Sequence, residues 1–149
     1  MSSTILVPID LRDRDNAEVV LNQAIQAARI ADAPLCVLSV VPDVISGIDL
    51  RYAIRGENAG SIEFDKQAML DGTLEALNDF VADRLPTDME VDTVVRHGTV
   101  YEQVLDLAEQ IDAGQIVMGA QDRGLTDFLL GSNAAIVVRH AKCSVSVVR

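Results

Sequence analysis

The chain alternates between short apolar runs and longer segments in which apolar residues recur at helical spacing. The apolar runs predict five strands, at residues 4–10, 35–41, 90–96, 115–119 and 143–149. Most of these runs are apolar on both faces, which is typical of strands covered on both sides of a sheet. The run at 90–96 instead alternates apolar and polar residues, as an edge strand does.

Four helices are predicted between the strands, at 16–31, from beyond residue 61 to near Pro86, at 100–111 and at 133–141. Asp15 and Glu18 form an N-cap and N3 pair at the start of the first helix. The stretch 43–61 has three glycines and little periodicity, which predicts a long loop. The inward stripes are Ala17, Val20, Leu21, Ala24 and Ala28 in the first helix, Leu70, Leu74, Leu77 and Val81 in the second, and Val100, Val104, Leu107, Ala108 and Ile111 in the third.

This alternation of strands and helices predicts an α/β fold. Strands that are apolar on both faces and separated by helices indicate a parallel sheet covered by helices on both sides. The right-handed rule for crossovers leaves few possible topologies. A chain of 149 residues is long enough for one domain with a full core, so we expect a single domain over residues 1–149. Ala, Val, Ile and Leu must build that core, because aromatic residues make up only 3% of the chain.

The charge of the chain narrows the range of its partners. A net charge of −11 argues against a general nucleic-acid binder and against an anionic membrane surface. It leaves room for a small phosphorylated ligand, since a local group of N–H donors can override the overall sign. No apolar run is long enough to span a membrane and the N-terminus has no basic region, so we expect a cytoplasmic protein without a signal peptide.

Candidate binding residues follow the ends of three predicted strands. In open α/β sheets, ligands bind beyond the carboxyl ends of the strands. Asp10 ends the first strand, where a carboxylate either faces a cleft or serves as a turn residue or helix cap. The tripeptide 131–133 enters the last helix, where Ser132 either caps the helix or donates to a phosphate.

Other residues are interpreted as structural. The charged run at 10–15 is mostly a solvated, capped loop. Met69 and Met89 are expected to fill the core. His97 and His140 have no third ligand at metal spacing, so no metal site is expected.

The combination of these segments resembles the universal stress protein family. The first strand ends in Pro-x-Asp, a glycine ends the fourth strand, and "LLGSNAAIVVRHAKCSVSVVR" closes the chain after a loop. The ending is most similar to the short bacterial subgroup in which "LLGSN" precedes the last helix. The resemblance implies a Rossmann-like five-stranded parallel sheet of order 3-2-1-4-5, homodimers and, in many members, bound ATP.

Nucleotide-binding members of that family carry the motif G-x2-G-x9-G-(S/T). Gly119 matches its first glycine and Gly131-Ser132 match its end, whereas Asp122 stands at the second glycine and the spacer is one residue shorter. Gly124 can supply flexibility nearby. By resemblance, the adenine and ribose side is lined by Pro8, Asp10, Val40 and Met118, and the ribose and phosphates are approached by Gly119, Gln121, Gly131, Ser132 and Asn133.

Arg123 is a further candidate from the residues themselves. As the only cation in the loop it can pair with a terminal phosphate, or it is simply a solvated loop residue. We expect ATP as the cofactor, together with Mg²⁺, and no catalytic residue is assigned.

Three functions remain open at this point. The first is a nucleotide-dependent regulatory module of the stress response that acts on an unidentified protein. The second is a slow ATPase or a protein that modifies itself with phosphate or AMP, although no Walker-type Lys and no obvious base are present. The third is a nucleotide-free dimerisation module, against which the retained glycines argue. A phospho-acceptor receiver domain is discounted, because Arg96-His97 ends the third strand where an Asp is needed.

The implied strand order makes two structural predictions. The last strand lies at a sheet edge with no helix after it, so we expect a homodimer joined through that edge. Cys36 and Cys143 lie three strand spacings apart, roughly 14 Å, which is too far for a disulfide. Both cysteines are therefore expected to be free thiols.

Overall fold

Five parallel strands form one sheet with the order β3-β2-β1-β4-β5, as predicted. The computed structural model describes residues 3–42, 59–120 and 130–149. The strands are β1 (Ile5–Pro8), β2 (Leu35–Pro42), β3 (Val91–Gly98), β4 (Gln115–Gly119) and β5 (Ser144–Val148). The helices are α1 (Arg14–Ala31), α3 (Ala59–Ala82), α4 (Val100–Gln110) and α5 (Ser132–His140).

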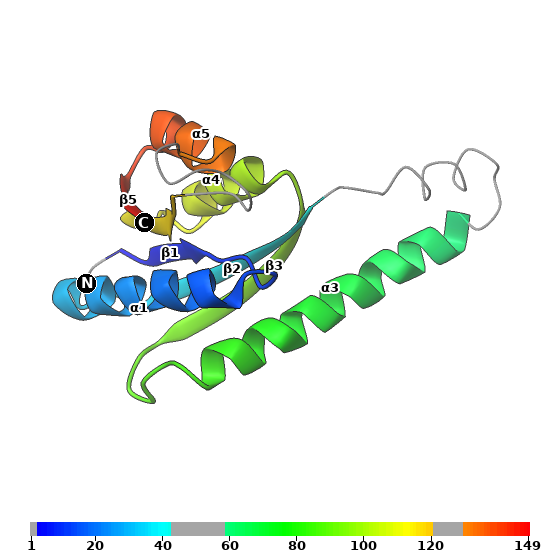
Figure 1. Cartoon of the computed structure of the whole chain (residues 1–149), viewed down its shortest axis with the longest axis horizontal. Coiled ribbons are helices and arrows are strands. Elements are labelled where there is room, and N and C mark those ends of the chain that lie inside the picture. Colours follow the sequence, from blue (N-terminus) through cyan, green and yellow to red (C-terminus); the bar gives the residue numbers. More distant parts are fainter. Residues whose placement is uncertain (1–2, 43–58, 121–129) are drawn as a thin grey trace.

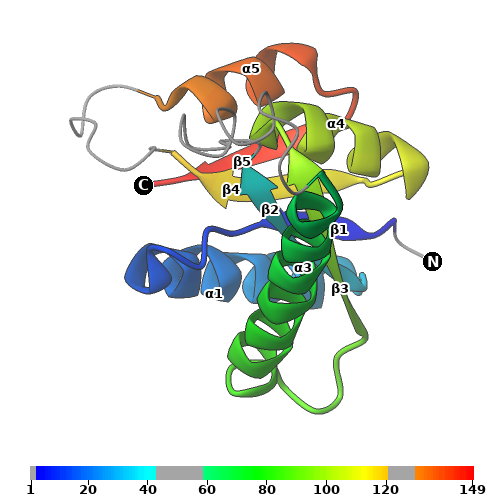
Figure 2. The same cartoon turned by 90° about the vertical axis from the view of Figure 1, so that its right-hand side faces the viewer.

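The helices cover the two faces of the sheet in pairs. Figures 1 and 2 show α1 and α3 on one face and α4 and α5 on the other. Side chains alternate between the faces along each strand. In β1, Ile5 and Val7 join the core that faces α1 and α3, and Leu6 joins the core that faces α4 and α5. The sheet is therefore the middle layer between two apolar cores.

Helix α1 buries the predicted stripe but begins at a different cap. Ala17, Val20, Leu21, Ala24 and Ala28 are all buried. The N-cap is Asp13, whose side chain accepts a hydrogen bond from the backbone N–H of Asn16 at 3.3 Å. Asp15 lies inside the first turn, so its assignment as N-cap was wrong. An acidic residue there still interacts favourably with the positive end of the helix dipole.

Helix α3 packs on the sheet only through its C-terminal part and extends past the sheet at its N-terminal end (Figure 1). Leu77 and Val81 are buried as predicted. Leu74 is 37% exposed and Met69 is 57% exposed, so their placement in the core was wrong. The reason is that the apolar pattern continues along the helix after the sheet has ended. Met89 does pack against the core.

The other helices follow the predicted pattern closely. In α4, Val104 and Leu107 are buried, and the remaining residues of the predicted stripe pack against the same core. The loop expected at 43–61 lies outside the described residues, except for 59–61, which belong to α3. Among the described helices, none has the length and hydropathy needed to cross a membrane.

Both cysteines are free thiols, as predicted. Cys36 is buried in β2, and Cys143 lies just before β5 rather than within it. Burial raises the pKa of the Cys36 thiol from 9.0 to about 11, with Asp92 adding to the shift. Burial also raises the pKa of Cys143.

We expect native protein at pH 8 to react slowly with a thiol reagent, because only the thiolate is nucleophilic. Cys143 should react before the buried Cys36. In urea, which unfolds the protein, both thiols should react together. As the pH rises from 9 towards 11, the unfolded chain loses the Cys36 proton first, so folding stability should fall in that window. The check is absorbance with an aromatic disulfide reagent, and two fast thiols in native protein would contradict the prediction.

Candidate functional site

A cavity of about 180 Å³ lies at the carboxyl ends of β1, β2 and β4. In open parallel sheets, ligands bind at this end of the strands. The strand order reverses here, because β1 is flanked by β2 on one side and β4 on the other. Six of the predicted site residues line the cavity: Pro8, Asp10, Val40, Met118, Gly119 and Asn133.

Three helices begin at this cavity. The start of α1 contributes Asn16 and Ala17, α4 contributes its first residue Val100, and α5 contributes Asn133 and Ala134. A helix N-terminus carries a partial positive charge and unpaired N–H groups, both of which favour an anion. Three helix dipoles therefore have their positive ends at this cavity, although the whole chain is acidic.

The three N-termini are capped differently. Asp13 caps α1 with its own carboxylate. The N–H of Tyr101 in α4 donates to Asn133 Oδ1 at 3.1 Å, so the Asn133 side chain ties α5 to the start of α4. The N-cap of α5 is Gly131, which has no side chain to offer. The N-cap of α4, Thr99, makes no side-chain cap hydrogen bond either, so of these three ends only α1 is capped by the side chain of its own N-cap residue.

The remaining predicted residues divide into two groups. Gly131 is buried and its N–H donates to the Ala120 carbonyl at 2.7 Å, while Ser132 is the exposed first residue of α5. Ser132 is therefore not the N-cap, because Gly131 takes that position. Neither residue lines the cavity. Gln121 and Arg123 lie outside the described residues, as do Asp122 and Gly124.

Gly119 has a packing reason to be glycine. A Cβ atom at this position would lie 3.0 Å from Asn16 Nδ2 and 3.5 Å from Val20 Cγ2. The absence of a side chain lets the start of α1 sit close to the end of β4. Asn16, Val20 and Gly119 all line the cavity, so this close approach forms its wall on the α1 side.

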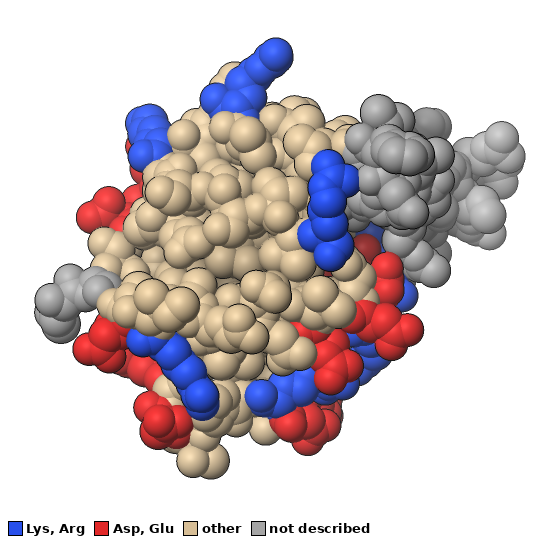
Figure 3. All heavy atoms as spheres, turned by 60° about the vertical axis from the view of Figure 1, so that its left-hand side comes forward, with Lys and Arg blue, Asp and Glu red and all other residues tan. Residues whose placement is uncertain are grey.

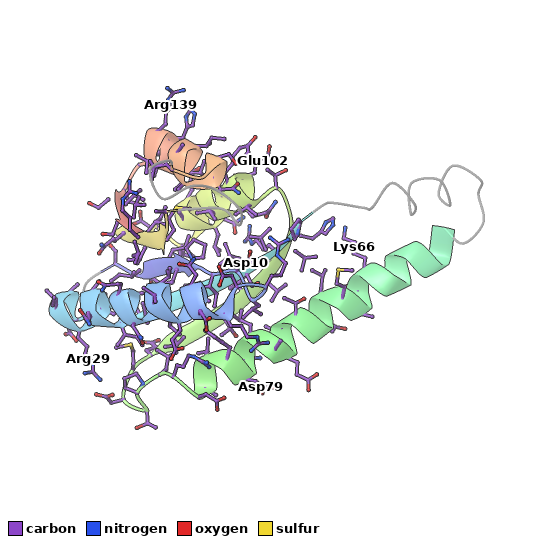
Figure 4. The ribbon with its side chains drawn as sticks, in the orientation of Figure 1. Asp10, Arg29, Lys66, Asp79, Glu102 and Arg139 are labelled. Carbon is purple, nitrogen blue, oxygen red and sulfur yellow. The ribbon has the colours of Figure 1, made fainter. Side chains whose placement is uncertain are left out.

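Arg12 lies beside Asp10 at the cavity and was missed by the sequence analysis. Its Nε and Nη2 atoms donate to the two carboxylate oxygens of Asp10, each at 3.0 Å. Its backbone N–H also donates to Asp10 Oδ1 at 2.9 Å. The hydrogen bond to Asp10 raises the pKa of the Arg12 guanidinium. Figure 4 labels Asp10 where the chain leaves β1 and approaches α1.

Asp13 and Asn16 also line the cavity without having been predicted. The charged run at 10–15 was interpreted as mostly a solvated, capped loop. The position of this loop in the sequence could have indicated that it lines the site. A loop that directly follows the first strand of a parallel sheet lies at the end of the sheet where ligands bind.

A larger hollow, about 1,070 Å³, lies at the opposite end of the sheet, where the strands begin. Its lining includes four acidic residues, Asp32, Asp88, Glu90 and Asp112. Asp32 and Asp112 follow the C-termini of α1 and α4, where the helix dipoles are negative. This hollow is therefore a poor site for a phosphorylated ligand. In the described part of the chain, no group of three His, Cys, Asp or Glu side chains could hold a metal ion.

An open parallel sheet with this strand order and a cavity at its switch point places the chain in the doubly wound, Rossmann-like class of α/β proteins. The chain matches the model of the universal stress protein family over residues 1–149, and it belongs to that family. Universal stress protein G of Salmonella typhimurium is 30% identical over 149 residues, which span all of both chains. The universal stress protein UspA of Lactobacillus plantarum has a similar structure, with 27% identity, coverage of 99% and 97%, and a TM-score of 0.67.

Two further solved structures share the fold and carry ligands. A universal stress protein in complex with cAMP is 20% identical, with coverage of 99% and 97% and a TM-score of 0.62. A universal stress protein of Archaeoglobus fulgidus in complex with dAMP is 21% identical, with coverage of 99% and 98% and a TM-score of 0.58.

Proposed function

We propose that this chain binds ATP, together with Mg²⁺, in the cavity at the switch point and acts as a nucleotide-dependent regulatory module of the stress response. The observation that carries the proposal is the meeting of six predicted residues and three helix N-termini around one cavity. The two relatives with cAMP and dAMP support an adenine nucleotide as the ligand class. A regulatory module also requires a partner protein, so we propose that the nucleotide-bound form acts on one that is not yet identified.

The lining suits the two halves of a nucleotide. Val40 and Met118 offer apolar surface to a flat base, and Asp10 offers carboxylate oxygens to ribose hydroxyl groups. Phosphates would extend towards the N-terminus of α5, whose N-cap residue Gly131 has no side chain to stand between a phosphate and the first turn. The cavity is smaller than the roughly 300–1,000 Å³ of typical ligand pockets. We therefore propose that the base enters it and the phosphates lie across its rim.

The test is calorimetric titration of nucleotide-stripped protein with Mg-ATP, together with mass spectrometry of any ligand extracted by acid. Binding of ATP with little phosphate release over hours supports a regulatory module. Steady phosphate release, or a protein mass increased by phosphate or AMP, would favour the slow enzyme instead. No binding at millimolar ATP would leave the nucleotide-free dimerisation module as the better interpretation.

We also propose a homodimer joined through β5. This strand is at the end of the strand order, so one row of its backbone groups has no neighbouring strand within the described sheet. Ile30, which is 89% exposed, lines a shallow hollow together with Val147 and Val148. The side that carries β5 in Figure 1 comes forward in Figure 3, where charged residues stand around an uncharged centre. Gln23, Gln26 and Arg149 also line this hollow, so a second copy of the chain would cover a surface of mixed apolar and polar character beside the open edge.

Replacing Val145 and Val147 together with Lys should weaken dimerisation at least tenfold, because two cations would face their copies across a two-fold axis. Sedimentation over a range of concentrations gives the dissociation constant. Because Val145 also packs against the core, thermal unfolding of the variant must be measured beside it. A folded variant that dimerises like the wild type would contradict the proposed interface.

A further inference from the structure

Asp10 and Arg12 form a preassembled ion pair at the cavity. The two side-chain hydrogen bonds form a fork, which is the strongest geometry for a guanidinium and a carboxylate. The pair is held in place by its own loop, because the Arg12 N–H bonds to Asp10 Oδ1 and the Asp13 N–H bonds to the Asp10 carbonyl at 3.1 Å. Two hydrogen bonds thus hold the guanidinium against Asp10, and two from backbone N–H groups hold the loop that carries both residues.

The charges around the cavity make this pair important for an anionic ligand. Among the described lining residues, the charged ones are Asp10, Arg12 and Asp13. Asp13 is engaged as the N-cap of α1. Without Arg12, an incoming phosphate would meet two carboxylates and no cation from the described lining. With Arg12, the charge of Asp10 is neutralised where the ligand enters.

Arg12 also has donors to spare. A guanidinium has five N–H groups, and the fork to Asp10 uses two of them. The side chain is 62% exposed, so a ligand at the rim can reach its outer edge. A phosphate can accept from the remaining donors while Asp10 stays paired or turns to a ribose hydroxyl group.

We propose that Arg12 determines the ligand class of this cavity and makes it prefer a nucleotide to the bare nucleoside. Arg12 does so in two ways: it cancels the charge of Asp10, and it donates to the phosphate nearest the ribose. This inference rests on the proposed function, since it assumes that an adenine nucleotide occupies the cavity. It assigns to Arg12 a role in binding the phosphate of the ligand and no role in binding the base.

AMP and adenosine are the sharpest pair of probes, because they differ only by one phosphate. Titrations followed by ¹H–¹⁵N spectra give both dissociation constants for the wild type, R12Q, D10N and the double variant. R12Q should weaken AMP binding about tenfold, the size of one lost charge-assisted hydrogen bond. Adenosine binding should change less than about threefold, because adenosine lacks the phosphate that Arg12 contacts. D10N should keep or increase the preference for AMP, since it leaves Arg12 without its carboxylate partner.

Arg14→Gln is the matched control. It removes the same charge two residues away, on a side chain that lies over Phe80 and does not line the cavity. Equal losses of AMP affinity in R12Q and Arg14→Gln would overturn the proposal, because overall charge would then explain both. Equal losses of AMP and adenosine affinity in R12Q, or no loss, would also overturn it. If the wild type binds Mg-ATP but neither AMP nor adenosine, this inference fails and the proposed function stands, whereas binding of none of the three defeats both.

Discussion

Replacing Gly131 with Val is expected to weaken Mg-ATP binding more than a hundredfold. Gly131 is the N-cap of α5, directly before the N–H groups that are proposed to meet the phosphates. In the proposed binding mode, a branched side chain here would crowd the phosphates that lie across the rim of the cavity. A loss of about 3 kcal/mol of contact free energy corresponds to more than a hundredfold in affinity.

The backbone at Gly131 does not itself forbid a side chain. Its φ of −60° and ψ of 156° lie in the extended region that any residue adopts. The residue is buried, however, and its N–H donates to the Ala120 carbonyl. A valine can therefore disturb packing as well as the ligand, and the binding loss must be separated from a loss of folding.

Two variants make that separation. Gly131→Ala adds one carbon and should give an intermediate loss of ATP affinity. Val138→Ala changes an exposed residue further along α5 and should leave ATP affinity unchanged. Calorimetry with Mg-ATP measures the affinities, and thermal unfolding shows whether each variant is folded at the titration temperature. A folded Gly131→Val protein with wild-type affinity would place the phosphates elsewhere.

The sheet could be predicted from the sequence because its signals are local and mutually consistent. Ile5, Leu6 and Val7 are apolar on both faces, which is typical of a central parallel strand. The spacing of Ala17, Val20, Leu21, Ala24 and Ala28 placed one face of α1 on that sheet. The order of the strands was predicted from the family resemblance, because a short apolar run does not indicate which strands lie beside it in the sheet.

Features that depend on the three-dimensional path of the chain were harder to predict. Asp13 and Asp15 are equally good caps by residue type, and only the backbone decides between them. Leu74 continues an apolar stripe that the sheet no longer covers. The hydrogen bond from Tyr101 to Asn133 joins residues 32 positions apart, and no local pattern announces it.

The glycines and the strand ends in the sequence predicted where the candidate site lies. They did not predict which charged side chains line it. Pro8, Asp10, Val40, Met118 and Gly119 come together because they end neighbouring strands. The cation predicted from the sequence was Arg123, in the loop at 121–129, which lies outside the described residues. The cation that the described cavity contains is Arg12, two residues from Asp10 and in a run that resembles an ordinary solvated loop.

Replacing Phe80 with Ala is expected to lower the free energy of unfolding by about 3–5 kcal/mol, the usual range for deleting a buried aromatic side chain. Phe80 is 1% exposed and belongs to the core between α3, α1 and the sheet. This loss is a large share of the roughly 5–15 kcal/mol that stabilises a typical domain.

The ring of Phe80 also supports Arg84. The Arg84 guanidinium lies 3.9 Å from the ring centroid, its Nη1 donates to the Phe80 carbonyl at 3.2 Å, and its Nε lies 3.8 Å from a Glu18 carboxylate oxygen. That Nε is buried and has no hydrogen-bond partner within the described residues. The face of the aromatic ring therefore supplies part of what solvent would otherwise give this cation.

Phe80→Leu separates the two contributions, because it keeps most of the buried apolar volume and removes the ring. It should cost about 1–2 kcal/mol, the sum of a partial cavity and the lost cation–π contact. Urea unfolding of wild type, Phe80→Ala and Phe80→Leu gives these free energies. Phe80 does not line the cavity, so the folded variants should bind Mg-ATP within about twofold of the wild type, since a distant core change leaves the lining residues in place. A loss below about 1 kcal/mol for Phe80→Ala would mean that α3 contributes far less to the core than its buried ring indicates.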